Sequence, residues 1–353
     1  MQDAKSNLQQ QKEALHRASK EDRNHKEIVL AAVKVDGRAL EHASKPLRGD
    51  KEVVMAAVSQ EGAALEMASE EMRGDRDVVL TSVLNSKRAR LGVLGSQLQH
   101  ASEALRSDKD FILSVVKEDG CELRYASEAL RDDTDVVMAA VKETGPALSV
   151  ASERLRDDRD VAMAAIEQNG RALANVSERL QNNREIVLAA VNETAYALQY
   201  SNLDFSNDRE IVKIAVKNSG GSLEYASDQL RNDKEILLLA VTQHGTALEF
   251  CSDALSRDMD VVMTAVQQNG VALEFAAECL RGERQVVMMA VKQDGDALEY
   301  ASDGLKADRS IVTAACEQKA SALQHAAKDL RNDRRIMMSS VWSIYDGIGY
   351  LAT

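Results

Sequence analysis

Large aromatic side chains and prolines are scarce in this chain of 353 residues, which has 3% aromatic residues and two prolines. So few rings argue against a thick central core and favour a thin one built from Leu, Val, Ile, Met and Ala. No run of 18 apolar residues occurs, so the sequence predicts no membrane span. The first 20 residues contain glutamines and charges of both signs, which is unlike a secretion signal. A targeting peptide removed before this numbering begins stays open.

Basic residues are outnumbered, since 44 Lys and Arg face 57 Asp and Glu and the net charge is −13. Nucleic-acid surfaces need clustered Lys and Arg, so we expect no nucleic-acid partner. The four cysteines, Cys121, Cys251, Cys279 and Cys316, have no metal-ligand spacing. They occupy positions that are usually small or apolar, which predicts reduced packing residues. We therefore expect a soluble intracellular protein in a reducing compartment, cytoplasmic or organellar.

Signs of catalysis are also missing. The six histidines are scattered, and none has a serine or cysteine nucleophile pattern beside it. The glycines recur singly instead of forming a phosphate-binding loop, and the carboxylates recur at regular positions. A catalytic site normally breaks local rules at one place, whereas these residues repeat. The sequence thus predicts no enzyme, no catalytic or cofactor-binding residue, no metal site and no cofactor.

What the chain does contain is a repeat with a period of 25 residues. The clearest copy runs from Leu223 to Leu248. Self-similarity at such a period indicates a repeat architecture. An anchor leucine marks each copy, starting with Leu15 and then at Leu40, Leu65, Leu98, Leu123, Leu148, Leu173, Leu198, Leu223, Leu248, Leu273, Leu298 and Leu323.

The second half of each copy has the pattern of an amphipathic helix. Asn232 is the expected N-cap, with Glu235 completing a capping box and Asp233 adding charge to the first turn. Gly245 is expected to end the helix in the left-handed conformation. Between them the apolar residues recur with helical spacing, at Ile236, Leu237, Ala240 and Val241.

The first half of each copy predicts a shorter helix. Leu223, Ala226 and Leu230 share one helical face. Pro46 cannot lie inside a helix, so we expect a 3₁₀ or one-turn segment after Ser44. A recurring alanine in the longer helix, such as Ala240, would let neighbouring helices approach closely. The predicted fold is all-α, an α-solenoid of about thirteen two-helix repeats stacked on one continuous core.

The repeat resembles a known family of short helical repeats of unknown function that is expanded in protists and found in some bacteria. Its pattern, A-L-x-Y-A-S-x-x-L-R-x-D-K-E-V-V-L-A-A-V, matches best at 223–241 and again at 297–304 with Asp308. The resemblance extends from Leu15 to Val341. It implies helical repeats but no biochemical role. More distantly, the layout is similar to armadillo, HEAT-like and leucine-rich-variant solenoids, which are mostly binding scaffolds.

The unbroken period predicts a single elongated repeat domain over 1–353. Residues 1–19 would form an N-terminal cap, 20–83 the first repeats and 96–341 the regular repeats. An insertion at 84–95 adds eight residues to the period and carries the basic residues Lys87, Arg88 and Arg90. It is either a tolerated loop or a partner-binding loop. The tail 342–353, with Trp342, is a closing cap or a docking segment, and we favour the cap.

Three further columns recur with the repeat. One holds Met or Leu in the longer helix, as at Met263, and its spacing favours the core. The second pairs an arginine with an aspartate, as in Arg231 and Asp233, and predicts a ladder of weak ion pairs between repeats. The third is aromatic and either packs between repeats or forms a row of interaction hot spots. Its aromatic members cluster at Tyr200, Tyr225, Phe250, Phe275 and Tyr300.

From these observations we hypothesise a non-enzymatic scaffold that binds one or more protein partners. The alternative is a structural or spacer subunit buried within a large assembly. The sequence leaves the partner, the compartment and the oligomeric state open.

Overall fold

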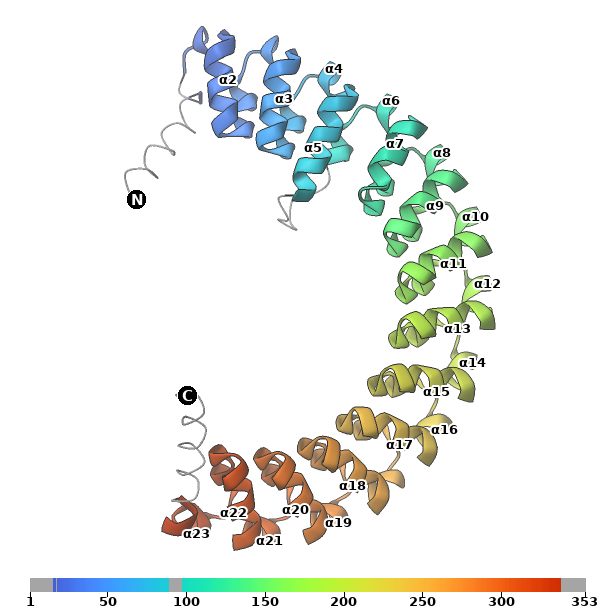
Figure 1. The fold of residues 1–353 in the computed structure, drawn as a ribbon, viewed down its shortest axis with the longest axis vertical. Coiled ribbons are helices and arrows are strands. Elements are labelled where there is room, and N and C mark those ends of the chain that lie inside the picture. Colours follow the sequence, from blue (N-terminus) through green and yellow to red (C-terminus); the bar gives the residue numbers. More distant parts are fainter. Residues whose placement is uncertain (1–14, 17, 89–96, 338–353) are drawn as a thin grey trace, which may run out of the picture. The chain divides into compact units, whose positions relative to one another are not determined.

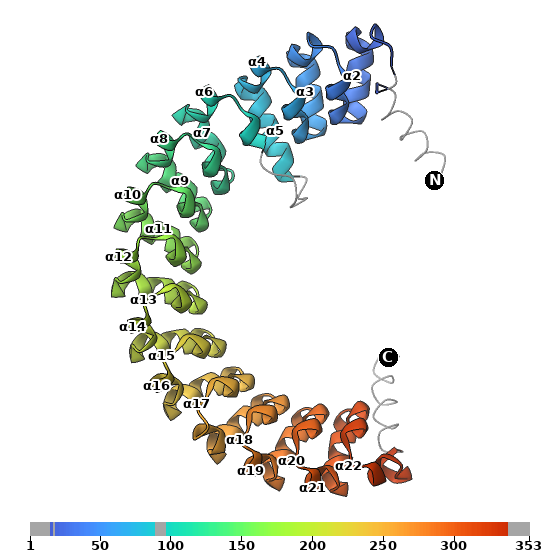
Figure 2. The same cartoon turned by 180° about the vertical axis from the view of Figure 1, so that it is seen from behind.

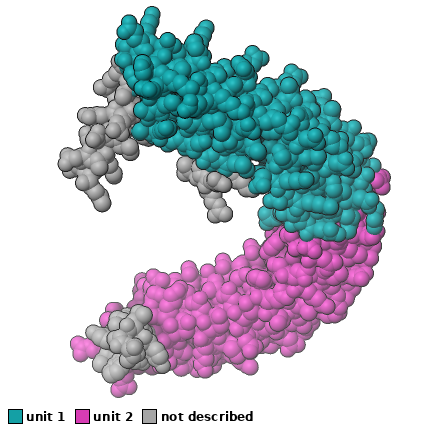
Figure 3. Space-filling model, turned by 45° about the horizontal axis from the view of Figure 1, so that its top comes forward, with its two compact units in different colours: residues 1–177 teal, residues 178–353 magenta. Residues whose placement is uncertain are grey.

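The computed structural model describes residues 15–16, 18–88 and 97–337. Within these ranges all regular structure is helical and there is no strand. The chain divides into two compact units, residues 1–177 and 178–353, which are coloured separately in Figure 3. The all-α repeat fold predicted from the period is confirmed. That the whole chain forms a single domain stays a prediction.

Each repeat consists of three helical segments. In one repeat of unit 2 these are α18 (Met259–Gln268), the 3₁₀ helix η13 (Gly270–Phe275) and the one-turn helix α19 (Glu278–Arg281). The shorter half is therefore divided into a 3₁₀ helix and a one-turn segment, and the latter is the segment expected after the serine. In several repeats a serine caps the one-turn helix, as Ser227 does by accepting a hydrogen bond from the Leu230 N–H. Ala277 precedes α19 without such a bond. A proline is accommodated there, because Pro46 directly precedes η3 (Leu47–Gly49).

In the described part of unit 1, six longer helices lie side by side (Figures 1 and 2). They are α2 (Lys26–Val35), α3 (Lys51–Gln60), α5 (Arg76–Arg88), α7 (Lys109–Val116), α9 (Thr134–Glu143) and α11 (Arg159–Gln168). The 3₁₀ helices after them are η2 (Gly37–His42), η4 (Gly62–Met67), η5 (Gln97–His100), η6 (Gly120–Tyr125), η7 (Gly145–Val150) and η8 (Gly170–Asn175). The one-turn segments are η1 (Asp22–Asn24), η3, α4 (Glu70–Arg73), α6 (Glu103–Arg106), α8 (Glu128–Arg131) and α10 (Glu153–Arg156).

Unit 2 repeats the arrangement (Figures 1 and 2). Its longer helices are α13 (Arg184–Glu193), α15 (Arg209–Asn218), α17 (Lys234–Gln243), α18, α20 (Arg284–Gln293) and α22 (Arg309–Gln318). Its 3₁₀ helices are η9 (Ala195–Tyr200), η10 (Gly220–Tyr225), η11 (Gly245–Phe250), η13, η14 (Gly295–Tyr300) and η15 (Ala320–His325). Its one-turn segments are α12 (Glu178–Gln181), α14 (Leu203–Ser206), α16 (Asp228–Arg231), η12 (Leu255–Arg257), α19, α21 (Asp303–Lys306) and α23 (Lys328–Arg331).

The core of each unit lies between the row of longer helices and the row of 3₁₀ helices. Most anchor leucines are fully buried in it, as Leu223 is with 0% exposure, whereas Leu323 is half-buried. The longer helices contribute Ile236, Leu237, Ala240 and Val241, and the equivalent residues of other repeats, to this core. Because one repeat cannot bury these residues alone, each unit is stable only as a stack.

The longer helices are capped one residue later than predicted. Asp233, not Asn232, is the N-cap of α17, and its carboxylate accepts hydrogen bonds from the N–H groups of Glu235 and Ile236. Asn232 instead ends α16, and its side chain accepts a hydrogen bond from the Ser252 hydroxyl of the next repeat. Both residue types are good caps, so composition alone did not distinguish the two positions.

The recurring glycine has a different role from the one predicted. Gly245 does not adopt a left-handed conformation but opens the 3₁₀ helix η11. A Cβ at this position would lie 2.4 Å from the backbone oxygen of Ala265 in the next repeat. The Gly245 N–H also donates to Oε1 of Gln268, at 2.6 Å. The recurring glycine of one repeat and the recurring alanine of the next therefore lie in close contact.

The predicted ladder of ion pairs is present, but its cation was wrongly assigned. Asp258 caps α18 and pairs with Lys234, the first residue of α17, at 2.8 Å. The arginine of the predicted pair is bound elsewhere, since Arg231 pairs with Asp228 in its own helix. Equivalent rungs join Lys26–Asp50, Lys51–Asp75, Lys109–Asp133, Arg184–Asp208, Arg209–Asp233, Arg284–Asp308 and Arg309–Asp333.

The insertion begins as helix, not as loop. Helix α5 has 13 residues and runs to Arg88, so the first residues of the insertion extend it. The stack continues across the break in period, because Arg76 still pairs with Asp108 at 2.7 Å. The backbone N–H of Ser102 also donates to the Arg73 oxygen at 2.8 Å, as equivalent residues do elsewhere. Residues 89–96 lie outside the described residues.

Candidate functional site

The aromatic column lies at the end of each 3₁₀ helix in unit 2. A 3₁₀ helix has three residues per turn, so side chains three apart share a face. In η11, Gly245 and Leu248 face the core, whereas Thr246 and Glu249 are exposed. Phe250 is half-buried at the edge between core and solvent. Tyr200, Tyr225, Phe275 and Tyr300 have the same intermediate exposure, so the column is neither buried core nor a free surface stripe.

A second column, of exposed carboxylates, runs beside the rings. It was not predicted from the sequence. Each glutamate directly precedes a ring, and the signal for it was the same 25-residue spacing. In unit 1 the equivalent positions from Gln99 onward are not acidic. We call the combined surface of unit 2 the ring–carboxylate row, and it consists of Tyr225, Phe250, Phe275 and Tyr300 with Glu224, Glu249, Glu274 and Glu299.

Contacts along the row join neighbouring repeats. Tyr300 lies close enough to Glu274 of the preceding repeat for the carboxylate to act on its hydroxyl group. Burial first, and then the charges of Glu274 and Glu299, raise the pKa of Tyr300 above its ordinary value of 10.0. One repeat further on, Glu299 Oε2 lies 3.9 Å from His325 Nε2. Each of these carboxylates therefore lies beside the ring of the repeat that follows it.

The repeat anchored by Leu198 departs from the pattern and adds a ring to the start of the row. Tyr196 meets Tyr225 edge to face, with ring centroids 6.2 Å apart. Gly221 makes room for Tyr196, since a Cβ there would lie 2.7 Å from the Tyr196 hydroxyl oxygen. The Ser219 hydroxyl donates to the same oxygen at 3.2 Å. Burial first, and then Glu224, raise the pKa of Tyr225.

The same repeat holds a local charge network on the longer helices. Lys213 stands where other repeats have Met or Leu, and it pairs with Glu235 of the next repeat. Arg209 also pairs with Glu235, at 2.6 Å. The hydrogen bond from Lys213 and then that from Arg209 lower the pKa of Glu235 to about 2. This irregular repeat therefore holds an ion-pair cluster with the repeat that follows it.

The prediction that the Met and Leu column is core was wrong. Met263, Met288 and Leu238 are half-buried on the surface of the longer helices, outside the buried stripe. The 25-residue spacing could not reveal this, because every column of a repeat has it. These side chains form a second, more apolar surface without the carboxylates of the ring–carboxylate row.

The other predicted binding residues belong to unit 1 or lie outside the described residues. Lys87 and Arg88 form the end of α5 in unit 1, whereas the row is in unit 2. Arg90 and Trp342 lie outside the described residues, as do the tail 342–353 and residues 1–14 and 17 of the expected N-terminal cap 1–19. A role of these residues in partner binding stays a prediction.

The cysteines are free, but not all of them pack in the core. Cys316 is fully buried and Cys251 is half-buried, and burial raises the pKa of both thiols, that of Cys251 to about 11. Cys121 and Cys279 are exposed, which corrects the prediction that all four are packing residues.

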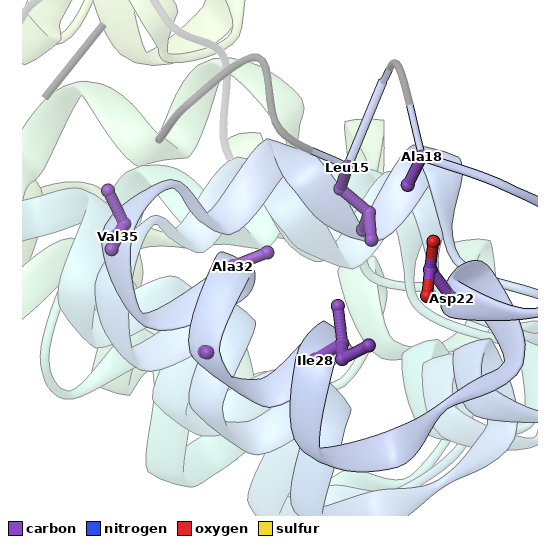
Figure 4. Close-up of a pocket in the computed structure, with 7 residues that line it drawn as sticks. Leu15, Ala18, Asp22, Ile28, Ala32 and Val35 are labelled. Carbon is purple, nitrogen blue, oxygen red and sulfur yellow. The ribbon is translucent and has the colours of Figure 1, made fainter. Parts of the chain in front are cut away.

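Unit 1 begins with an apolar hollow of about 520 Å³ (Figure 4). Leu15, Ile28 and Ala32 line it, and Ile28 is 41% exposed. The equivalent residue of the next repeat, Val53, is fully buried. The face of α2 that lines the hollow is thus the face that, in α3, is buried against the preceding repeat.

The described part of the chain contains no group of three or more His, Cys, Asp or Glu placed to hold a metal ion. None of the described helices is long and apolar enough to cross a membrane.

The stacked three-segment unit makes this chain an all-α helical repeat protein. A family model described as a domain of unknown function (DUF4116) matches residues 4–48, 50–89, 94–131, 108–156, 133–181, 158–206, 208–256 and 258–306. The chain therefore belongs to this family, and the resemblance inferred from the repeat is confirmed. No curated protein and no solved structure matches the chain.

Proposed function

We propose that this repeat protein is a non-enzymatic scaffold that binds a partner protein along the ring–carboxylate row of unit 2. The observation that carries the proposal is the partial exposure of Tyr225, Phe250, Phe275 and Tyr300. Aromatic side chains with one solvent-exposed edge are favoured in protein interfaces, where they supply large contact areas at a low cost in conformational entropy. Their regular spacing provides several equivalent contacts for one partner, so that weak contacts add together.

The test is affinity capture with the purified chain from an extract of the cells that produce it. The double variant Tyr225→Leu with Phe250→Leu keeps apolar bulk at both positions but removes the rings. We expect it to lose a partner that the unchanged chain retains. The matched control is His100→Leu with Tyr125→Leu, which alters the same column in unit 1 and should retain that partner. Melting curves for both variants show whether either change unfolds the chain.

The capture also distinguishes the alternative function. A spacer subunit is held along much of its surface, so neither double variant would release it from its assembly. Retention of the same stoichiometric complex by both variants would therefore contradict docking on the row and favour the spacer.

A further inference from the structure

Within the described residues, three of the four glutamates of the row lack the cations that pair with other carboxylates of this protein. Asp208, Asp233, Asp258 and Asp308 each pair with a Lys or Arg of the preceding repeat. Among the ion pairs of the described residues, none involves Glu224, Glu249 or Glu274. These three exposed charges are thus left uncompensated along one line of unit 2, and a ligand that brings cations would complement them.

Ring and carboxylate together favour a particular kind of cation carrier. A guanidinium or ammonium group is attracted to the face of an aromatic ring and pairs strongly with a carboxylate. Each step of the row offers both groups, as Phe250 does with Glu249. Side chains of Arg and Lys also have apolar stems that would cover the half-buried rings. This combination suits a basic protein segment better than a small cation.

The spacing of the row indicates how the cations are placed in that segment. Packed helices lie about 8–10 Å apart, so neighbouring steps of the row are separated by about that distance. A polyproline II segment rises about 3.1 Å per residue with three residues per turn. Every third side chain then points the same way, at intervals of about 9.3 Å. In a β-strand, successive third residues would point to opposite faces.

We propose that the ring–carboxylate row binds an extended basic segment of the partner protein, with Arg or Lys at every third residue. This inference rests on the function proposed above and specifies the chemistry of the partner. Each cation lies between a carboxylate and the ring of the following repeat, the relationship shown by Glu299 and the His325 ring 3.9 Å away.

The test is fluorescence anisotropy with the full chain and labelled peptides of about 12 residues, long enough for four steps of a polyproline II segment. One peptide carries arginine at every third position among Pro, Ala and Gln. A second has the same composition with its arginines at every second position. We expect the first peptide to bind about tenfold more tightly than the second, a difference of about 1.4 kcal/mol. Equal affinities would overturn the proposed spacing.

The protein variants test the charges. The quadruple variant Glu224→Gln, Glu249→Gln, Glu274→Gln and Glu299→Gln should lower the affinity for the first peptide at least about tenfold. The control variant Asp228→Asn, Asp253→Asn, Glu278→Gln and Asp303→Asn removes as many charges in the same repeats. Asp228, Glu278 and Asp303 begin one-turn helices, Asp253 precedes η12, and all four are exposed. Similar losses in both variants would show general attraction to an acidic protein and would overturn the proposal.

The two proposals can fail separately. If captured partner is lost with Tyr225→Leu and Phe250→Leu but no basic peptide binds, the row binds protein of another chemistry and only the basic segment is refuted. If peptide binding and partner capture are both unaffected by changes in the row, both proposals are refuted.

Discussion

The backbone oxygen of Ala265 lies 2.4 Å from the place that a Cβ on Gly245 would occupy. Equivalent contacts recur in unit 2, at Gly220 with Ala240 and at Gly295 with Ala315. Gly245→Ala must therefore push two repeats apart, and we expect a loss of about 1–3 kcal/mol. Gly304→Ala is the matched control, because no atom lies within 4 Å of its Cβ position. It should be neutral or slightly stabilising in chemical denaturation.

The anchor leucines should dominate the stability of the stack. Leu223 is fully buried, and Leu223→Ala should lower the free energy of unfolding by about 2–5 kcal/mol. Met259 is 40% exposed at the start of α18, so Met259→Ala should cost far less. Denaturation monitored by circular dichroism gives both values. Equal losses would mean that the 25-residue period does not mark the core.

Gly245 and Leu223 illustrate which features of the fold could be predicted from the sequence. The period correctly indicated helical repeats, because every repeat needs the same buried residues. It could not show the direction of each side chain, since exposed and buried columns have the same spacing. Met263 was therefore wrongly placed in the core, and Glu249 was overlooked beside Phe250. The glycine was recognised as a constant feature, but its reason lies in Ala265, 20 residues away in the next repeat.

Acid should weaken the ladder between repeats. Asp308 caps α22, and hydrogen bonds from Ser310 and Ile311 together with Arg284 lower its pKa from 3.8 to about 2. A carboxylate with a lower pKa in the folded state stabilises the fold above its unfolded pKa. That stability is lost as the pH falls from about 4 towards 2. Melting temperatures across this range should fall less steeply for Asp308→Asn, which retains a good cap but cannot titrate.

The rung between α18 and α20 is missing and can be restored. Met259 stands where the cation belongs, and Glu283 caps α20 without a side-chain hydrogen bond. Glu283→Asp should stabilise the chain by about 0.5–2 kcal/mol by supplying the cap. Adding Met259→Lys should contribute up to about 1 kcal/mol more, and less at high salt. A double-mutant cycle measures the coupling, and its absence would show that the rungs add nothing beyond the caps.

The most direct test of the proposed binding surface is site-specific photo-crosslinking in the native cell extract. A benzophenone amino acid replaces Phe250 in the ring–carboxylate row or, as the control, Met259 on the neighbouring longer helix. Both sites belong to unit 2 and are accessible to solvent, at least in part. Docking on the row predicts a crosslinked partner from position 250, through a segment rich in Arg or Lys, and none from position 259. A partner crosslinked from position 259 alone would contradict docking on the row.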